Sequence, residues 1–475
     1  MKKANLGELI VVMKKNPKKY LILIFIFIPL VIIALALWIA SRWDVWFGNH
    51  PEPPYSALHE PSRVLMTYSE DGQSVQLSWQ HDTIPHQSVV EYADVSSSHN
   101  DLLYRSEVRY TVFNSRSGQT VFYRTEMKNV KDGNDYKYRI CTAKDTTQWY
   151  YFSLPNTDNH FSFIFFGDVQ DEVSGGFDTL FSQVMNRNTN RAFVLFGGDL
   201  IERPMDKYWG EVFRSFDTLS ATCPILAIPG NHEYLKGLTR RLEARFPLVF
   251  PYFGDSLPIK EYGVAQNSVY TFAKGDARFF FLDSNRDFWN YFSQRRWLKE
   301  ELEKSRERWK FVVLHHPIHS TKGFFNGLMV RLFFEDVIEE HHVDVVLQGH
   351  EHVYARSLLL ENGKLTTPLY LVSYSSQKDY PMKFYGDVNK WGTADRYYQK
   401  FEVSSDSLVL NTYRSNHELY DKVVLKKSCF GDVEVEDQGK NIPQLIEVSE
   451  WFRTNKREKR IKEFEKSIQE WKQRQ

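Results

Sequence analysis

The chain has 475 residues, with 60 lysines and arginines balanced by 60 aspartates and glutamates. This length allows two or three domains, and the neutral charge balance excludes a strongly basic nucleic-acid binder, so we expect no nucleic-acid partner. The three cysteines are widely spaced and odd in number, so the sequence predicts neither a cysteine-based metal site nor a disulfide framework.

The N-terminus contains an apolar segment, residues 20–40, that is long enough to cross a bilayer as a helix. Because six lysines precede it and few charges follow, the positive-inside rule predicts a basic cytoplasmic segment at 1–19 and a single-pass anchor at 20–40. A cleaved signal peptide is the alternative, since residues 34–36 resemble a cleavage site. Both interpretations place the rest of the chain outside the cytoplasm, in a periplasmic or extracellular location.

A spacer and a small β-domain are predicted next. Residues 41–59 include a proline-rich stretch that is typical of an extended spacer. Within residues 60–155, the segments 75–79 and 136–140 alternate between apolar and polar positions, as half-buried strands do, and glycine-containing turns separate the strand candidates. We therefore expect a small all-β sandwich here.

The segment 160–427 contains five short apolar, β-rich runs, and each is followed at once by a polar signature. These runs alternate with predicted helices at 178–186 and 293–307, a rhythm that indicates a layered α/β fold. Polar residues just past the carboxyl ends of neighbouring strands meet at one edge of a sheet. The signatures are Asp168, Gly198-Asp199, Gly230-Asn231-His232-Glu233, His315 and Gly349-His350-Glu351-His352.

The residue types in these signatures predict a site for two metal ions. A carboxylate can bridge two divalent cations, and a mixed set of imidazole, amide and carboxylate ligands suits first-row metals such as Mn, Zn or Fe without selecting one. Taken singly, each signature is equally typical of a helix cap, a turn or a structural histidine. The occurrence of all five in order favours the metal site.

The order D, GD, GNHE, H, GHxH resembles that of the calcineurin-like metallophosphoesterases. The stretch 343–357 is similar to the last motif of their purple acid phosphatase branch, and the resemblance covers residues from about 61 to about 425. It implies an α/β (α+β layered) metallophosphoesterase sandwich preceded by a fibronectin-type domain at 60–155. It also implies a phosphate-ester substrate and acid phosphatase-like activity.

The resemblance further implies a role for each polar residue. His232 would stabilise the phosphate charge or protonate the leaving oxygen, with Glu233 orienting its ring. The implied metal ligands are Asp168 and His352 for the first metal, Asp199 as the bridge, and Asn231, His315 and His350 for the second metal.

The first-metal set departs from the family pattern. Glu202 stands where purple acid phosphatases carry a tyrosine, and Gln170 stands where many other members of the superfamily have a histidine. Either residue is a candidate additional ligand, so we expect a weaker, exchangeable first metal without the purple colour. His316 and His319 are further candidates to contact the ligands or the substrate.

Three other segments are singled out by their composition. The loops 252–266 and 321–327, rich in glycine and aromatic residues, are candidate walls of the substrate site. The charged tail at 443–475 places apolar residues on one helical stripe, which predicts an amphipathic helix that packs on its own domain. Docking on a membrane surface and dimerisation are the alternatives.

The sequence thus predicts a membrane-anchored, dinuclear metallophosphoesterase that hydrolyses phosphomonoesters outside the cytoplasm by means of a metal-activated hydroxide. Phosphodiester or pyrophosphate hydrolysis on the same fold is the alternative within the enzyme class. A non-catalytic surface receptor or scaffold, binding through the β-domain, is the alternative outside it.

Overall fold

The computed structural model describes residues 17–69, 72–96, 102–158, 160–171, 173–252, 268–285 and 288–474. The predicted cytoplasmic segment up to residue 16 and most of the candidate wall 252–266 lie outside the described residues. The chain forms two compact units, Met1–Pro51 with Leu235–Arg241, and Glu52–Tyr234 with Leu242–Gln475.

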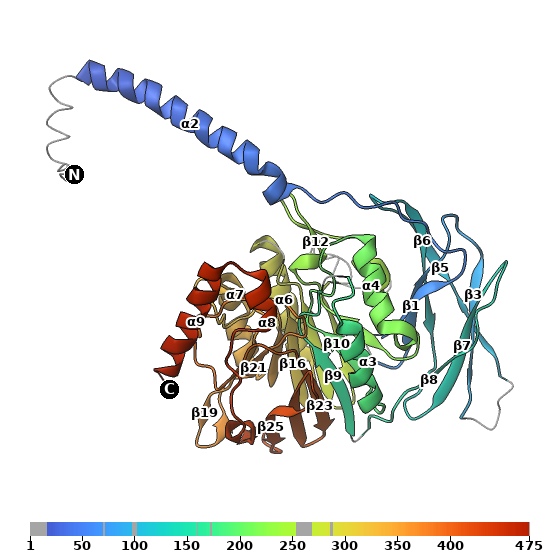
Figure 1. Cartoon of the computed structure of the whole chain (residues 1–475). Coiled ribbons are helices and arrows are strands. Elements are labelled where there is room, and N and C mark those ends of the chain that lie inside the picture. The colour runs from blue at the N-terminus through green and yellow to red at the C-terminus, as the bar shows by residue number, and fades with distance from the viewer. Residues whose placement is uncertain are drawn as a thin grey trace. The chain divides into compact units, whose positions relative to one another are not determined.

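The first unit is built around α2 (Pro17–Phe47), which runs past the predicted end at residue 40 (Figure 1). Between residue 40 and Gly48 the sequence has no proline or glycine, so the helix continues beyond its most apolar part. Its portion Phe25–Phe47 is long and apolar enough to cross a membrane, by length and composition only, and its side chains are not buried. A signal sequence has the same properties, so the anchor and the cleaved leader both remain predictions.

The β-rich N-terminal part of the second unit is a sandwich of two four-stranded antiparallel sheets. In its core the ring of Trp79 stacks on Tyr123, and both side chains are buried because they lie on the inward face of alternating strands. One sheet contains β1 (Ser62–Tyr68), β2 (Val75–Gln80), β6 (Gln119–Met127) and β5 (Arg109–Asn114). The other contains β4 (Tyr104–Glu107), β3 (Ser88–Asp94), β7 (Asp135–Thr142) and β8 (Tyr150–Ser153).

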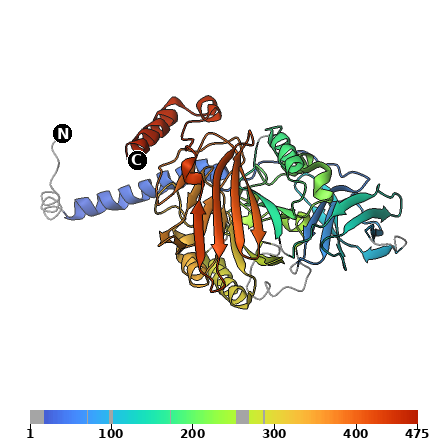
Figure 2. The same ribbon diagram turned by 90° about the horizontal axis from the view of Figure 1, so that it is seen from below.

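Two larger sheets follow in the same unit. The nine-stranded sheet has three parallel strands at one end and antiparallel strands after them, and Figure 2 shows this sheet from below. Its order is β11 (Ile225–Ala227), β10 (Phe193–Phe196), β9 (His160–Phe166), β23 (Tyr397–Ser404), β24 (Ser407–Arg414), β25 (Leu419–Lys427), β26 (Val433–Asp437), β20 (Lys364–Leu365) and β19 (Leu360–Glu361). The seven-stranded sheet has the order β14 (Tyr270–Lys274), β15 (Ala277–Leu282), β16 (Trp309–Leu314), β17 (Val345–Gln348), β21 (Leu369–Val372), β18 (Tyr354–Ser357) and β22 (Lys390–Gly392).

Phenylalanines join the two sheets face to face. Phe163 of β9 makes edge contacts with Phe279 of β15 and Phe311 of β16, at centroid distances of 5.2 and 5.6 Å. Helices cover the outer faces, so the layers are helix, sheet, sheet, helix (Figure 1). The helices and remaining short elements are α3 (Phe177–Arg187), α4 (Asp206–Phe216), η1 (Asp217–Ala221), η2 (Asn231–Glu233), β12 (Tyr234–Leu235), β13 (Arg241–Leu242), α5 (Phe246–Val249), α6 (Phe288–Lys304), α7 (Leu328–Glu340) and η4 (Gly439–Asn441).

The β-sandwich and the layered sheets share one continuous hydrophobic core. Tyr68 of β1 stacks on Phe272 of β14 with a centroid distance of 5.4 Å. Arg63 forms a bidentate ion pair with Asp206 at the start of α4, with N–O distances of 2.7 and 3.0 Å. The sandwich is therefore packed against the layered sheets and not tethered to them by a linker alone.

The C-terminal tail folds into α8 (Glu450–Asn455) and α9 (Glu458–Lys472). Its apolar stripe packs on the same unit, in a second core cluster that contains Val353 and Phe384. Trp471 lies against Phe384, with ring centroids 5.5 Å apart. Because Val353 directly follows His352, the tail supports the segment that carries the last polar signature.

Candidate metal centre

The five polar signatures meet at one edge of the layered sheets. Asp168, Asp199 and Asn231 follow the parallel strands β9, β10 and β11, whereas His315 and His350 follow β16 and β17 of the other sheet. The carboxyl ends of parallel strands face the same edge, so the predicted ligands come close together. One ligand atom each of Asp168, Asp199 and His315 lies within 4.8 Å of the others, and all three residues are buried.

The residues expected at the first metal surround a carboxylate oxygen that lacks a hydrogen-bond donor. Nε2 of His352 lies 3.0 Å from Oδ2 of Asp168. The amide nitrogen of Gln170 lies 3.1 Å from the same Nε2 and 3.2 Å from Oδ2 of Asp199. Oδ2 of Asp168 is buried without a hydrogen-bond partner among the described residues. Burying a carboxylate oxygen without a partner costs free energy unless a cation binds it, so this donor set fits a metal ion.

The residues expected at the second metal are also in mutual contact. Nε2 of His315 lies 3.3 Å from Oδ2 of Asp199 and 3.3 Å from the amide oxygen of Asn231. The same amide oxygen lies 2.8 Å from Nδ1 of His350. A carboxylate, an amide oxygen and two imidazoles are a suitable set for a first-row divalent metal.

The glycines of the signatures allow this close approach. A Cβ atom on Gly230 would lie 2.1 Å from Oδ1 of Asp199, and one on Gly349 would lie 2.2 Å from Oδ1 of Asp168. Asp199, His350 and His352 have positive φ angles of 49°, 71° and 49°. Left-handed backbone is unfavourable for these residues, and its concentration at the predicted ligands is typical of a functional site.

Opposite charges stabilise one another in this cluster. Burial lowers the pKa of His315, but the carboxylates of Asp199 and Asp168 outweigh burial and raise this pKa to about 10. Burial would raise the pKa of Asp199, yet the imidazoles of His315 and His232 hold it below its usual range. Asp199 is therefore ionised and available to a cation at neutral pH.

Glu233 does not orient the ring of His232, contrary to the expectation. Its carboxylate accepts hydrogen bonds from the backbone N–H groups of Asp199, Leu200 and Ile201, at 2.8 to 3.1 Å, and from Gly230 at 2.6 Å. These donors all belong to the two turns that carry Asp199 and Asn231, so Glu233 fixes the turns. The ring of His232 instead donates from Nδ1 to the backbone carbonyl of Glu202, at 2.6 Å.

The other four candidates differ in their relation to the cluster. Gln170 contacts it directly, whereas the carboxylate of Glu202 accepts a hydrogen bond from the Lys378 ammonium. His316 stacks beside His350, with ring centroids 4.2 Å apart.

His319 does not join the cluster. Its Nε2 lies 3.1 Å from Glu335 of α7, and its ring packs edge-on against Tyr370. His319 follows β16, as His315 does, but its side chain contacts α7 and not the cluster.

Three residues near the cluster were not predicted as site residues. The backbone carbonyl of Lys378 accepts a hydrogen bond from Nδ1 of His352 at 2.5 Å. The ring of Tyr380 lies 4.3 Å from that of His352, and Nζ of Lys322 lies 4.9 Å from the Tyr380 ring. Only Lys322 had a sequence signal, because it belongs to the candidate wall 321–327.

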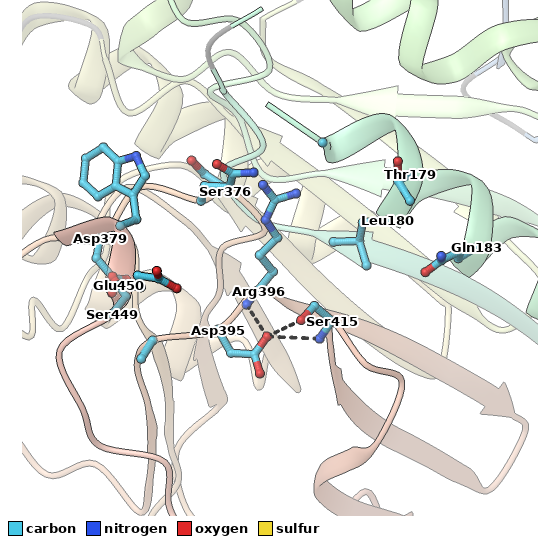
Figure 3. Close-up of a pocket in the computed structure, with 14 residues that line it drawn as sticks. Thr179, Leu180, Gln183, Ser376, Asp379, Asp395, Arg396, Ser415, Ser449 and Glu450 are labelled. Atoms are coloured by element: carbon cyan, nitrogen blue, oxygen red, sulfur yellow. Dashed lines mark hydrogen bonds between the residues drawn. The ribbon is translucent and has the colours of Figure 1, made fainter. Parts of the chain in front are cut away.

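A separate pocket of about 460 Å³ lies behind the segment 376–380 (Figure 3). Ser376 and Asp379 line this pocket, whereas Tyr380 of the same segment packs beside His352. Asp395 fixes the pocket wall by accepting hydrogen bonds from the backbone of Arg396 and from Ser415. None of the six predicted metal ligands lines this pocket, so it is distinct from the metal centre.

Comparisons with known proteins agree with this geometry. The model of the calcineurin-like phosphoesterase family matches residues 161–354. A phosphoenolpyruvate phosphatase of Allium cepa is 24% identical over 430 residues, which are 85% of each chain. An Fe(3+)-Zn(2+) purple acid phosphatase of Arabidopsis thaliana is 25% identical over 321 residues, 64% of this chain and 66% of that protein. The purple acid phosphatase PPD1 from yellow lupin (Lupinus luteus) seeds superimposes with a TM-score of 0.62, at 15% identity, over 78% of this chain and 74% of that one.

The fold, the ordered predicted ligands and the family match identify residues 161–354 as a calcineurin-like phosphoesterase domain. A relative named as a purple acid phosphatase supports the purple acid phosphatase-like branch, and the similar structure shows the same fold. The resemblance drawn from the sequence is confirmed in both respects, and so is the expectation of an enzyme with phosphatase relatives.

Proposed function

We propose that this protein is a dinuclear metal-dependent phosphatase that hydrolyses phosphomonoesters outside the cytoplasm. The observation that carries the proposal is the buried group of Asp168, Asp199 and His315, in which one carboxylate oxygen lacks a hydrogen-bond donor. The phosphatase names of the relatives support the same class of reaction.

The residues of this cluster would hold two metal ions. Asp168 and His352 would bind the first and Asp199 would bridge, while the second would be held by Asn231, His315 and His350. When bound, two such ions polarise a phosphoryl group and lower the pKa of a water molecule toward neutrality. Mn, Zn and Fe all suit these ligands, and one relative is an Fe(3+)-Zn(2+) enzyme.

His232 is suited to protonate the leaving oxygen. Burial lowers its pKa, but the carboxylates of Asp199 and Glu202 outweigh burial and raise it. Because Nδ1 is held by a backbone carbonyl, Nε2 is the atom that gains and loses the proton, and it lies 3.9 Å from Oδ2 of Asp199. A cationic imidazole here would also stabilise negative charge on the phosphoryl oxygens.

The rest of the chain would place this chemistry outside the membrane. We propose that α2 is an uncleaved anchor with the N-terminus in the cytoplasm, because the lysines that precede the apolar segment favour that orientation. The two-sheet domain at 60–155 would be a fibronectin-type domain, which its position before the catalytic domain at 160–427 supports. Its shared core with the layered sheets supports a structural role.

The full-length protein in detergent tests the proposal by its turnover of p-nitrophenyl phosphate, a phosphodiester and pyrophosphate. Each substrate is assayed with chelator and with added Mn(II) or Zn(II), and Asp199→Asn is compared with the exposed Asp145→Asn. We expect metal-dependent hydrolysis of the monoester that is lost only in Asp199→Asn. Preferred diester or pyrophosphate turnover would change the substrate class, and no turnover with any metal would favour a receptor or scaffold.

A further inference from the structure

Lys322 presents an ammonium group beside the predicted ligands of the first metal. Its Nζ lies over the ring of Tyr380, 4.9 Å from the centroid. Tyr380 in turn packs against His352, whose Nε2 lies 3.0 Å from Asp168. Lys322 thus lies one aromatic ring away from the proposed metal ligands.

This ammonium group is half-buried and has no carboxylate partner among the described residues. Within the described part of the chain, Nζ of Lys322 makes no hydrogen bond and lies more than 4.0 Å from every carboxylate oxygen. Burial lowers the pKa of Lys322, although the charges of Glu351 and Asp168 oppose the effect. Lys378, whose backbone carbonyl contacts His352, is already paired with Glu202 through its ammonium group. A cation withdrawn from water without a negatively charged partner is costly, and an incoming anion would relieve that cost.

The loop that carries Lys322 is fixed by the last polar signature itself. Glu351 lies between His350 and His352, and its buried carboxylate accepts hydrogen bonds from the Ser320 hydroxyl at 2.5 Å and from the backbone N–H of Thr321 at 2.7 Å. The hydroxyl of Thr321 also bonds this carboxylate. The position of Lys322 is therefore coupled to that of the proposed ligands.

We propose that Lys322 binds the phosphoryl group of the substrate and favours phosphomonoesters over phosphodiesters. This inference rests on the proposed function, because the metal ligands define where the phosphoryl group lies. A monoester dianion carries one more negative charge than a diester, and that additional charge gains most from a nearby ammonium group. A charge-assisted hydrogen bond from lysine to phosphate oxygen is the contact that we assign.

The test compares Lys322→Met and Lys322→Arg with Lys383→Met, which removes an exposed lysine from the neighbouring 376–391 segment. Titration of the full-length protein with inorganic phosphate, with and without Mn(II), measures binding independently of turnover. We expect Lys322→Met to weaken phosphate binding about 10- to 100-fold. Lys322→Arg should keep most of the affinity, and Lys383→Met should equal the wild type.

Turnover gives the second measurement. In Lys322→Met, kcat/KM for p-nitrophenyl phosphate should fall more than kcat/KM for bis-p-nitrophenyl phosphate, with an unchanged thermal unfolding midpoint. Equal losses on the two esters, or phosphate affinity within twofold of the wild type, would overturn the inference while leaving the proposed function intact. If phosphate binding depends on Lys322 but the protein has no turnover, that result would contradict the proposed function and not the binding role of Lys322.

Discussion

The ammonium group of Lys378 donates a hydrogen bond to the carboxylate of Glu202, the residue that replaces the tyrosine of purple acid phosphatases. The backbone carbonyl of Lys378 also accepts the Nδ1 hydrogen bond of His352, at 2.5 Å. One residue therefore connects the substituted position with a proposed ligand of the first metal. Because the Glu202 charge is already paired, this carboxylate is a poor substitute for the missing phenolate.

The absence of a tyrosine at position 202 predicts the colour of the iron-loaded protein. We expect no violet absorption band after reconstitution with ferric iron, because no tyrosine stands at position 202 to form the iron–phenolate pair. Visible absorption spectra of the wild type and of Glu202→Tyr, loaded in parallel, check this. A violet band in the wild type would show that another phenol, with Tyr380 the nearest to His352, binds the iron.

Gly230 is predicted to be intolerant of any side chain. Its alanine variant would place Cβ 2.1 Å from Oδ1 of Asp199 and displace the proposed bridging carboxylate. A misplacement of this size near reacting groups costs about 100-fold in rate, so we expect Gly230→Ala to lose about that much kcat/KM. The matched variant is Gly210→Ala in α4, whose Cβ would meet only the flexible end of Arg63, at 3.1 Å. Wild-type rates in Gly230→Ala would refute the close packing of this turn.

The C-terminal tail is predicted to support the metal centre through its apolar stripe. Trp471→Ala removes a buried ring that packs on Phe384, so we expect unfolding to become easier by about 3–5 kcal/mol. The same core cluster contains Val353, which directly follows the proposed ligand His352. Activity should therefore fall together with stability. Denaturant unfolding and kcat/KM are measured beside Lys462→Ala, on the exposed side of α9, which should change stability by less than about 0.5 kcal/mol. A Trp471→Ala protein as stable as wild type would exclude a packed tail.

Glu243 should make stability depend on pH. Burial raises its pKa from 4.5 to about 7, although the nearby Arg245 opposes the shift. Between these two values the folded chain keeps a proton that the unfolded chain releases, so the free energy of unfolding should fall as the pH rises. We expect Glu243 to contribute a fall of about 1–3 kcal/mol across this window, so Glu243→Gln should make the slope shallower by that amount. Denaturant unfolding at pH 5 and pH 7 in chelator, with the exposed Glu60→Gln as control, checks this slope, and a slope in Glu243→Gln equal to that of the wild type would exclude a contribution from Glu243.

The strands of this fold, and the convergence of the proposed ligands at one edge, could be predicted because their signals are local. The apolar run before Asp168 forms β9, and the run before Asp199 forms β10. Short buried strands depend mainly on continuous apolar character, and a ligand that directly follows such a strand is placed by the strand itself.

The contacts around the ligands could not be predicted in the same way. Its place in the sequence predicts that Glu233 orients its neighbour His232, but four backbone N–H groups from two turns donate to its carboxylate, and those turns meet only in the folded chain. Lys378 and Tyr380 belong to no motif, and they reach His352 through a loop whose path depends on tertiary packing.

The number of metal ions bound per chain tests the central claim most directly. Full-length protein reconstituted with Mn(II) or Zn(II), freed of excess metal and measured by plasma mass spectrometry, should carry about two ions per chain. The ion held by Asp168 and His352 should be lost more readily on dilution into chelator. Asp199→Asn should retain about one ion or fewer, whereas Asp145→Asn should match the wild type. A wild-type protein that binds no more metal than Asp199→Asn would contradict a dinuclear centre at this site.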